Sequence, residues 1–150
     1  MYERILVAVD GSKPSERALG EALRLARSGA ALKLVHVVDL APLAFEMELS
    51  NLAAIEEAMR EAGHHHLRKA LECVHAGKLR ADVALLEVRK PMERIADLIV
   101  QDARTYGADL IVLGTHGRRG LGHLVMGSVA EGVVRVAPVP VLLVRADEKR

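Results

Sequence analysis

The sequence is poor in aromatic residues, and this shortage bears on function. Its 150 residues include two tyrosines, one phenylalanine and no tryptophan. Proteins that bind single-stranded nucleic acid stack the bases on aromatic side chains. The formal net charge is only +1, so the chain also offers no strongly basic surface to a polyanion. We therefore expect no nucleic-acid partner.

Cysteine and long apolar runs are scarce as well. Cys73 is the single cysteine, so no intrachain disulfide can form, which suits a reducing compartment. No apolar run approaches the roughly 18–20 residues of a membrane span. The opening stretch "MYERILVAVDGS" lacks the pattern of a secretory signal. The sequence thus predicts a cytoplasmic protein with no membrane partner.

Aliphatic residues, in contrast, are abundant, and their spacing alternates between two patterns. Hydrophobic residues make up 51% of the chain, enough for a core in one domain spanning residues 1–150. Apolar runs predict strands at residues 4–10, 32–39, 80–88, 108–114 and 139–145. Helical spacing predicts helices at residues 12–29, 52–76, 92–103 and 128–136, with Met92 on the apolar face of the third and Gly63 only a mild weakness in the second. This order predicts one α/β domain with a mostly parallel sheet and helices on both faces.

A glycine-rich loop precedes the last predicted helix. Ser128 and Glu131 have the S-x-x-E spacing of a capping box, which predicts Ser128 as the N-cap residue. The amides of Val129 and Ala130 would then be free at the positive end of the helix dipole, where phosphate binds readily. From loop composition alone, a plain flexible connection is an equal alternative, because the common nucleotide-binding glycine signatures are missing.

Asp10 follows the first strand, and the glycine-rich loop follows the fourth. Ligands of open α/β sheets bind beyond the carboxyl ends of the strands, so both segments face one crevice if these strands are neighbours. A carboxylate repels bare phosphate but is a good ligand for phosphate-bound Mg²⁺ (or Mn²⁺). Asp10 is therefore the candidate metal ligand.

The spacing of the glycines resembles a family motif. Gly114-x-x-Gly117, nine residues and then Gly127-Ser128 is similar to the G-2x-G-9x-G-(S/T) motif of ATP-binding universal stress proteins. The segments "RILVAVDGSKPSERAL", "LKLVHVVD" and "ADLIVLGTHGRRGLGHLVMGSVAEGVVRVAPVPVLLVR" extend the resemblance over nearly the whole chain. It implies a single-domain, open five-stranded parallel sheet in the order 3-2-1-4-5, with the first and fourth strands adjacent.

The resemblance also implies a set of ATP-binding residues. The backbone around Val9, together with Asp10, would line the pocket, and the backbone of Val37 would meet the adenine. The residues expected to border the ribose and hold the phosphates are Leu113, Gly114, Gly117, Gly127, Ser128 and Val129. The loop adds Ala130 through its free amide, and Gly120 and Arg118 or Arg119 as phosphate contacts. With so few aromatics, aliphatic side chains must sandwich the base, which favours micromolar affinity, about −8 kcal/mol.

Histidines invite other interpretations. His64, His65 and His66 are consecutive on a predicted helix, so their rings point about 100° apart and cannot converge on one ion; we expect them on a solvated or helix–helix surface. His36 lies within a strand and is expected to be a hydrogen-bonded interior or partner-facing histidine. His116 either donates to phosphate or organises the loop.

Two further features concern the edges of the predicted sheet. The stretch from Val139 to Val144 is very hydrophobic for an edge strand, and pairing with a second copy would cover it. The resemblance implies the same homodimer. At the end of the third strand, residues 87–90 (Glu-Val-Arg-Lys) replace the Gly-Pro-like turn of many relatives.

These observations predict an ATP-binding stress-response or regulatory protein whose nucleotide occupancy changes the loop and what it presents to still unidentified protein partners. The alternative is a slow Mg²⁺-dependent ATPase or a self-phosphorylating enzyme. Fast hydrolysis needs an oriented water and charge neutralisation at the γ-phosphate. The motif supplies no dedicated lysine or glutamine for these tasks.

Overall fold

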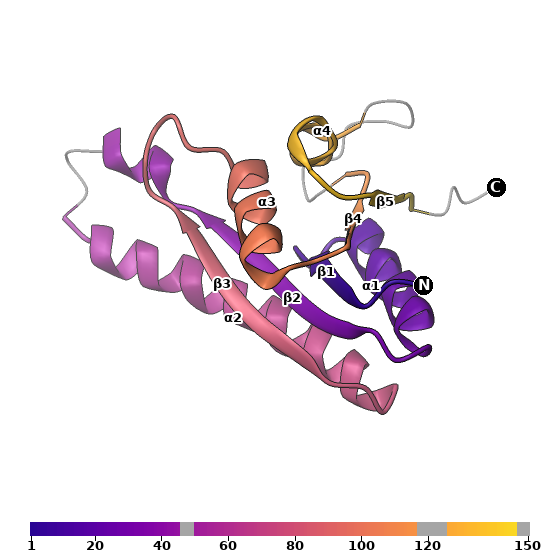
Figure 1. Cartoon of the computed structure of the whole chain (residues 1–150). Coiled ribbons are helices and arrows are strands. Elements are labelled where there is room, and N and C mark those ends of the chain that lie inside the picture. The colour runs from indigo at the N-terminus through magenta and orange to yellow at the C-terminus, as the bar shows by residue number, and fades with distance from the viewer. Residues whose placement is uncertain (46–49, 117–125, 147–150) are drawn as a thin grey trace.

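A computed structural model describes residues 1–45, 50–116 and 126–146. Its described part forms one five-stranded sheet in the order β3-β2-β1-β4-β5, with every neighbouring pair parallel (Figure 1). This confirms the predicted fold and strand order. No helix in these ranges is long and apolar enough to cross a membrane.

The elements follow the predicted alternation. They are β1 (Arg4–Ala8), α1 (Lys13–Ala26), β2 (Ala31–Asp39), the 3-10 helix η1 (Ala41–Phe45), α2 (Leu52–Ala76), β3 (Ala81–Val88), α3 (Ile95–Tyr106), β4 (Leu110–Gly114), α4 (Ser128–Val136) and β5 (Val141–Val144). The third helix begins later than expected, and Met92 is 92% exposed in the preceding segment. A turn closed by the Glu93 amide and the Lys90 carbonyl at 3.1 Å, with Pro91 inside it, delays the helix.

Helices cover both faces of the sheet. Adjacent residues of a strand point to opposite faces, so Ile5 and Val7 pack with α1 and α2, whereas Leu6 packs with α3 and α4. Because both faces are buried, the strands read as nearly continuous apolar runs rather than alternating ones. The two cores meet at the central strands β1 and β4.

Gly63 has a larger role than the mild weakening expected of it. It is buried in the middle of α2, and a Cβ there would lie 2.7 Å from Leu85 Cδ1 and 2.8 Å from His36 Cδ2. Ordinary van der Waals contact starts near 3.4 Å, so a side chain would overlap with the sheet. The glycine therefore lets α2 approach β2 and β3 closely.

Polar groups tie together the amino end of the sheet. The Asp109 carboxylate accepts from the Glu3 amide at 2.7 Å and from the Arg4 amide at 3.0 Å. Arg4 Nη1 donates to the Tyr106 carbonyl at 2.6 Å. Lys33 Nζ lies 2.9 Å from Asp102 Oδ1, and both side chains are mostly buried. The start of β1 is thus fixed to the segment between α3 and β4.

Candidate functional site

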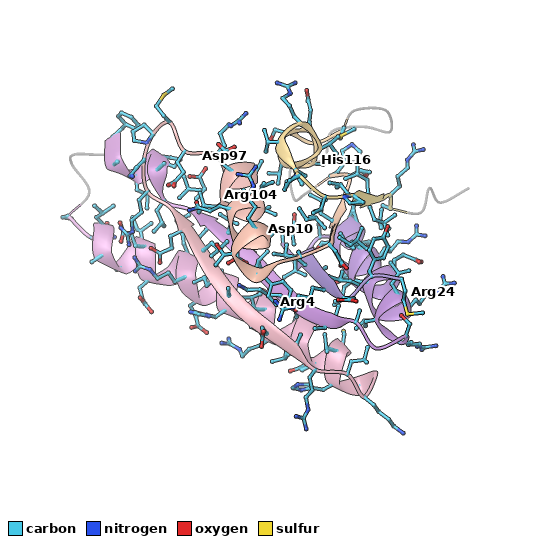
Figure 2. All side chains as sticks on the ribbon, viewed as in Figure 1. Arg4, Asp10, Arg24, Asp97, Arg104 and His116 are labelled. Atoms are coloured by element: carbon cyan, nitrogen blue, oxygen red, sulfur yellow. The ribbon has the colours of Figure 1, made fainter. Side chains whose placement is uncertain are left out.

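A cavity of about 570 Å³ opens at the carboxyl end of the sheet. It lies beyond the last residue of β1 and is bounded by β2, β4 and the first turn of α4, with α2 and α3 contributing walls. Figure 2 labels Asp10 and His116, which follow β1 and β4 at this end, and Arg4, which begins β1 at the other. The place is the one expected for a ligand of an open α/β sheet.

Most residues predicted for the site line this cavity. They are Val9, Asp10, Val37, Leu113, Gly114, His116, Gly127, Ser128, Val129 and Ala130. Gly117, Arg118 and Gly120 lie outside the described residues. Segments more than a hundred positions apart in sequence therefore meet in one place, as the crevice argument required.

The chain leaves the sheet after Ala8 through a set of local hydrogen bonds. The Asp10 amide donates to Ser15 Oγ at 3.0 Å, and the Ser12 amide donates to Asp10 Oδ1 at 2.9 Å. Gly11 adopts φ +79°, a left-handed conformation that favours glycine. Ser12 then caps α1, its hydroxyl accepting from the Ser15 amide at 3.3 Å. These bonds hold the Asp10 side chain at the wall of the cavity.

β2 continues beyond its last partner on β1. Val35 is the last residue of β2 in register with β1, and its carbonyl accepts from the Val9 amide at 2.8 Å. Alternate residues of a strand direct their N–H and C=O groups to the same side, so those of Val37 also face the β1 side. Within the described ranges neither group has a backbone partner there. Val37 thus presents one donor and one acceptor to the cavity.

The start of α4 differs by one residue from the predicted cap. Gly127, with extended φ −63° and ψ 154°, is the N-cap, and no side chain caps the helix. The Glu131 amide bonds the Gly127 carbonyl at 3.0 Å, so the capping box expected from Ser128 and Glu131 is not formed. The S-x-x-E pattern was misleading because α4 begins one residue earlier than a cap at Ser128 predicts, so Ser128 is its first helical residue and not its cap.

This correction adds a third amide to the two that were expected to be free at the start of α4. Ser128 becomes the first helical residue, so the amides of Ser128, Val129 and Ala130 all precede the first intrahelical donor. None has an acceptor in the part of the chain that the structure describes. The Gly127 amide donates to the Thr115 carbonyl at 2.7 Å, which fixes the helix start to the end of β4. Three aligned donors therefore face the cavity at the positive end of the helix dipole.

Gly114, the first glycine of the motif, has a packing role. A Cβ at this position would lie 2.7 Å from Pro14 Cβ, 2.8 Å from the Pro14 carbonyl carbon and 3.0 Å from the Ser15 nitrogen. The missing side chain therefore lets β4 pack against the first turn of α1, while the backbone of Gly114 borders the cavity. A larger residue here would disturb the fold before it disturbed a ligand.

His116 contacts the end of β4 with one ring nitrogen and borders the cavity. Its Nδ1 lies 3.0 Å from Thr115 Oγ1, which organises the end of β4. Its Nε2 is buried and has no hydrogen-bond partner among the described residues. Because His116 also lines the cavity, this nitrogen is available to a ligand there.

The consecutive histidines separate into two groups. His64 and His65 are exposed, as expected, but His66 is half-buried, with its ring centroid 5.4 Å from that of His36. A Cβ on Gly11 would overlap with the His66 imidazole, so the expected surface position is wrong for His66. No cluster of three or more His, Cys, Asp or Glu suited to a metal ion occurs within the described ranges.

Several lining residues were not predicted from the sequence. Those on helices are Met59, Ala62 and Gly63 on α2, and Ile95 and Ile99 on α3. Helical spacing predicts which face of a helix packs on the sheet but not which positions border a cavity. Asp39 also lines it, and its Oδ1 accepts from the Ala41 amide at 3.2 Å. Its place at the end of β2, like that of Asp10 after β1, was a usable signal.

Glu87 and Arg89, two of the unusual residues at the end of β3, belong to an ion-pair network. Glu87 Oε1 lies 2.6 Å from Arg60 Nε, and Arg60 Nη2 lies 3.0 Å from Glu56 Oε2. The hydrogen bond from Arg60 is the main cause that holds the pKa of Glu87 below its usual value, against the effect of burial. The network links α2 to the end of β3 beside the cavity wall.

Comparison with known proteins points to one family. The sequence matches the model of the "Universal stress protein family" over residues 1–145. A universal stress protein of Methanocaldococcus jannaschii is 32% identical over 150 residues, covering 99% of this chain and 85% of that protein. A solved member of the family from Burkholderia pseudomallei is 33% identical, with a TM-score of 0.74 over 95% of this chain and 96% of that one. The universal stress protein from Archaeoglobus fulgidus in complex with dAMP is 27% identical, with a TM-score of 0.65 over 95% and 98%.

Proposed function

The chain belongs to the universal stress protein family, and we propose that it binds ATP in the cavity at the carboxyl end of its sheet. The observation that carries this proposal is the pairing of two unlike features in one cavity. Among the described residues, Val37 offers a donor and an acceptor without backbone partners, and the start of α4 offers three donors without acceptors. The first suits a base and the second suits phosphate.

The base would be read by the backbone of Val37. Adenine carries a ring-nitrogen acceptor beside an amino-group donor, the complement of the Val37 N–H and C=O. Val9, Val37 and Leu113 line the cavity with aliphatic side chains, as the shortage of aromatics required. The volume of about 570 Å³ falls inside the range of roughly 300–1,000 Å³ typical of small-molecule sites.

The phosphates would lie at the start of α4. The free amides of Ser128, Val129 and Ala130 satisfy anionic oxygens directly, and the helix dipole favours negative charge there. No three-ligand metal cluster exists in the described residues, so Mg²⁺ or Mn²⁺ would be held mainly by phosphate oxygens and water, with Asp10 as a protein ligand. The dAMP complex of the Archaeoglobus fulgidus relative supports a nucleotide of this class.

The test is a calorimetric titration of the purified protein with ATP and Mg²⁺, after any co-purifying nucleotide has been removed and identified. We expect micromolar binding of one ATP per chain, about −8 kcal/mol. No binding at millimolar ATP would overturn the proposal. Measuring ADP in the same samples over time tests the alternative, because slow hydrolysis of ATP would produce it.

Two further parts of the proposal concern assembly and regulation. β5 is an edge strand, paired with β4 on one side only within the described ranges, and it is apolar throughout. We expect residues 139–144 of two copies to pair in a homodimer, which light scattering at micromolar concentration checks. Nucleotide occupancy would change what the dimer presents to protein partners in the stress response of a cytoplasmic protein.

A further inference from the structure

The ladder of backbone hydrogen bonds between β1 and β2 ends one bond earlier than the positions of the two strands would allow. In a parallel pair, successive bonds alternate regularly between the strands. After the bond from the Val9 amide to the Val35 carbonyl, the next would run from the Val37 amide to the Val9 carbonyl. That bond is absent from the described backbone hydrogen bonds. The Val9 carbonyl instead lies 2.7 Å from Nδ1 of the buried His36 ring.

We propose that His36 is a positioning residue that keeps the base-reading edge of Val37 open and thereby sets the preference for adenine. The imidazole donates to the Val9 carbonyl and holds it away from the Val37 amide. The donor of Val37 is then left for a ligand. This inference rests on the proposed ATP site, because it assigns the base-recognition part of that same cavity.

The position of the His36 ring is fixed from several sides. A carbonyl accepts but cannot donate, so the 2.7 Å contact requires a proton on Nδ1. The Cδ2 edge faces Gly63, where even a methyl group would come within 2.8 Å. His66 stands on another side, with ring centroids 5.4 Å apart and planes inclined by 48°. The ring is 9% exposed, so little room exists for another rotamer.

The open edge of Val37 discriminates between purines. Its N–H and C=O match the acceptor and donor of adenine, whereas hypoxanthine and guanine present a donor and an acceptor in the reverse order. A site built for one pattern rejects the other because buried polar groups are left unpaired. If the Val9 carbonyl took the Val37 amide, one of the two discriminating bonds would be lost. The preference for ATP over ITP should then fall by roughly tenfold or more.

The experiment compares His36→Leu with His36→Asn, whose side-chain amide can place an N–H near the position of Nδ1. The first readout is hydrogen exchange at the Val37 amide in nucleotide-free protein. We expect it to slow by at least about tenfold in His36→Leu, as the amide pairs with Val9. In His36→Asn it should stay near the wild-type rate. The second readout is the ratio of ATP to ITP affinity, expected to fall in His36→Leu and recover in His36→Asn.

A measurement on the unmodified protein keeps the inference testable if His36→Leu does not fold. Nitrogen-15 spectra of labelled histidine should show His36 protonated at Nδ1, and a neutral ring protonated only at Nε2 would overturn the inference. An unchanged Val37 exchange rate or ATP-to-ITP ratio in folded His36→Leu would also overturn it while leaving ATP binding intact. If wild-type protein binds no ATP, the proposed function fails and the selectivity role fails with it, even where the exchange result holds.

Discussion

The backbone amides at the two ends of the sheet differ in whether protein groups accept from them. At the amino end, the Asp109 carboxylate accepts hydrogen bonds from the amides of Glu3 and Arg4, and Lys33 forms an ion pair with Asp102. At the carboxyl end, β1 stops before β2, and α4 begins without a side-chain cap. Backbone donors there face a cavity of about 570 Å³ instead of protein partners. Figure 2 labels one residue toward each end, Arg4 at the start of β1 and Asp10 just after it.

If the proposed function holds, stability and binding reside largely at opposite ends of the same strands. Pairing polar groups with each other stabilises the chain, but it leaves nothing for a ligand to bind. Donors left unpaired cost some stability and gain a partner only when the ligand arrives. Substitutions at the two ends should therefore move different properties.

The largest expected effect is on binding, from Ser128→Asp. A carboxylate at the first turn of α4 interacts favourably with the helix dipole, so the protein should fold at least as well. The same charge would repel phosphate from the free amides, and ATP affinity should fall by roughly 100-fold or more, about 3 kcal/mol. Calorimetry measures the affinity and thermal unfolding the stability.

Ser128→Asn is the matched control, because it adds similar volume without charge. It should lose much less affinity than Ser128→Asp. Equal losses from both variants would mean that volume rather than charge matters at this position, against a phosphate site.

Gly63→Ala sharpens the comparison because Gly63 is a structural glycine at the binding end. Its new methyl group would press on Leu85 and His36, and we expect the free energy of unfolding to fall by about 1–3 kcal/mol. ATP affinity should fall too, since Gly63 lines the cavity. Denaturant unfolding and calorimetry report the two effects.

Gly20→Ala is the control for that change. Gly20 lies within α1, and a Cβ there would meet nothing within 4 Å. Alanine should therefore stabilise the protein by about 0.5–1 kcal/mol through helix propensity. Destabilisation of similar size by both alanines would contradict the close-approach role of Gly63.

Asp102→Ala tests whether a substitution at the amino end of the sheet lowers stability without affecting binding. It leaves the Lys33 ammonium, whose side chain is 16% exposed, without its carboxylate partner. We expect unfolding free energy to fall by about 1–3 kcal/mol, while ATP affinity stays within about twofold. Asp97→Ala, which removes an exposed pair with Arg94, should change stability by less than the Asp102 variant. A large loss of ATP binding in Asp102→Ala would break the separation of the two ends.

The smallest expected effect is on the pH dependence of stability, from Asp109→Asn. Burial raises the pKa of Asp109, but the hydrogen bonds from the Glu3 and Arg4 amides outweigh it and hold the pKa below its usual value. A carboxyl with a lowered folded-state pKa stabilises the protein above the unfolded value, about 3.9, and loses that contribution as pH falls through the folded-state pKa. Asp109→Asn should therefore be less stable than wild type at pH 6 by about 1 kcal/mol. The difference should narrow toward pH 3, and a constant difference would exclude the carboxylate as its source.

Apolar periodicity was enough to predict the layers, the parallel sheet and most element bounds. Both faces of the sheet are buried, so strand runs and helical faces leave clear marks in the sequence. The strand order came from the family resemblance. Met92 was placed on a helix wrongly because its spacing fitted, while the turn containing Pro91 set the true start.

The site was predictable where function follows from position in the fold. Asp10 after β1 and Val129 in the first turn of α4 belong to the cavity because strand ends and helix starts meet there. Competition between close neighbours was not predictable. Two such choices are which of Gly127 and Ser128 caps α4, and which of His36 and Val37 donates to the Val9 carbonyl. Both depend on small differences in the distances between neighbouring groups. The packing roles of Gly63 and Gly114 were not predictable either, because the atoms that a side chain would overlap with belong to other elements of the fold.

The most direct test follows every backbone amide at once during a titration with ATP and Mg²⁺. Nuclear magnetic resonance of nitrogen-15-labelled protein should show shifts at Val37, Ser128, Val129 and Ala130, which line the cavity. The amide resonances of Glu3, Arg4 and Asp109 at the amino end should not shift. No shifts at millimolar ATP, or shifts centred on the amino end, would contradict a nucleotide site at the carboxyl end of the sheet.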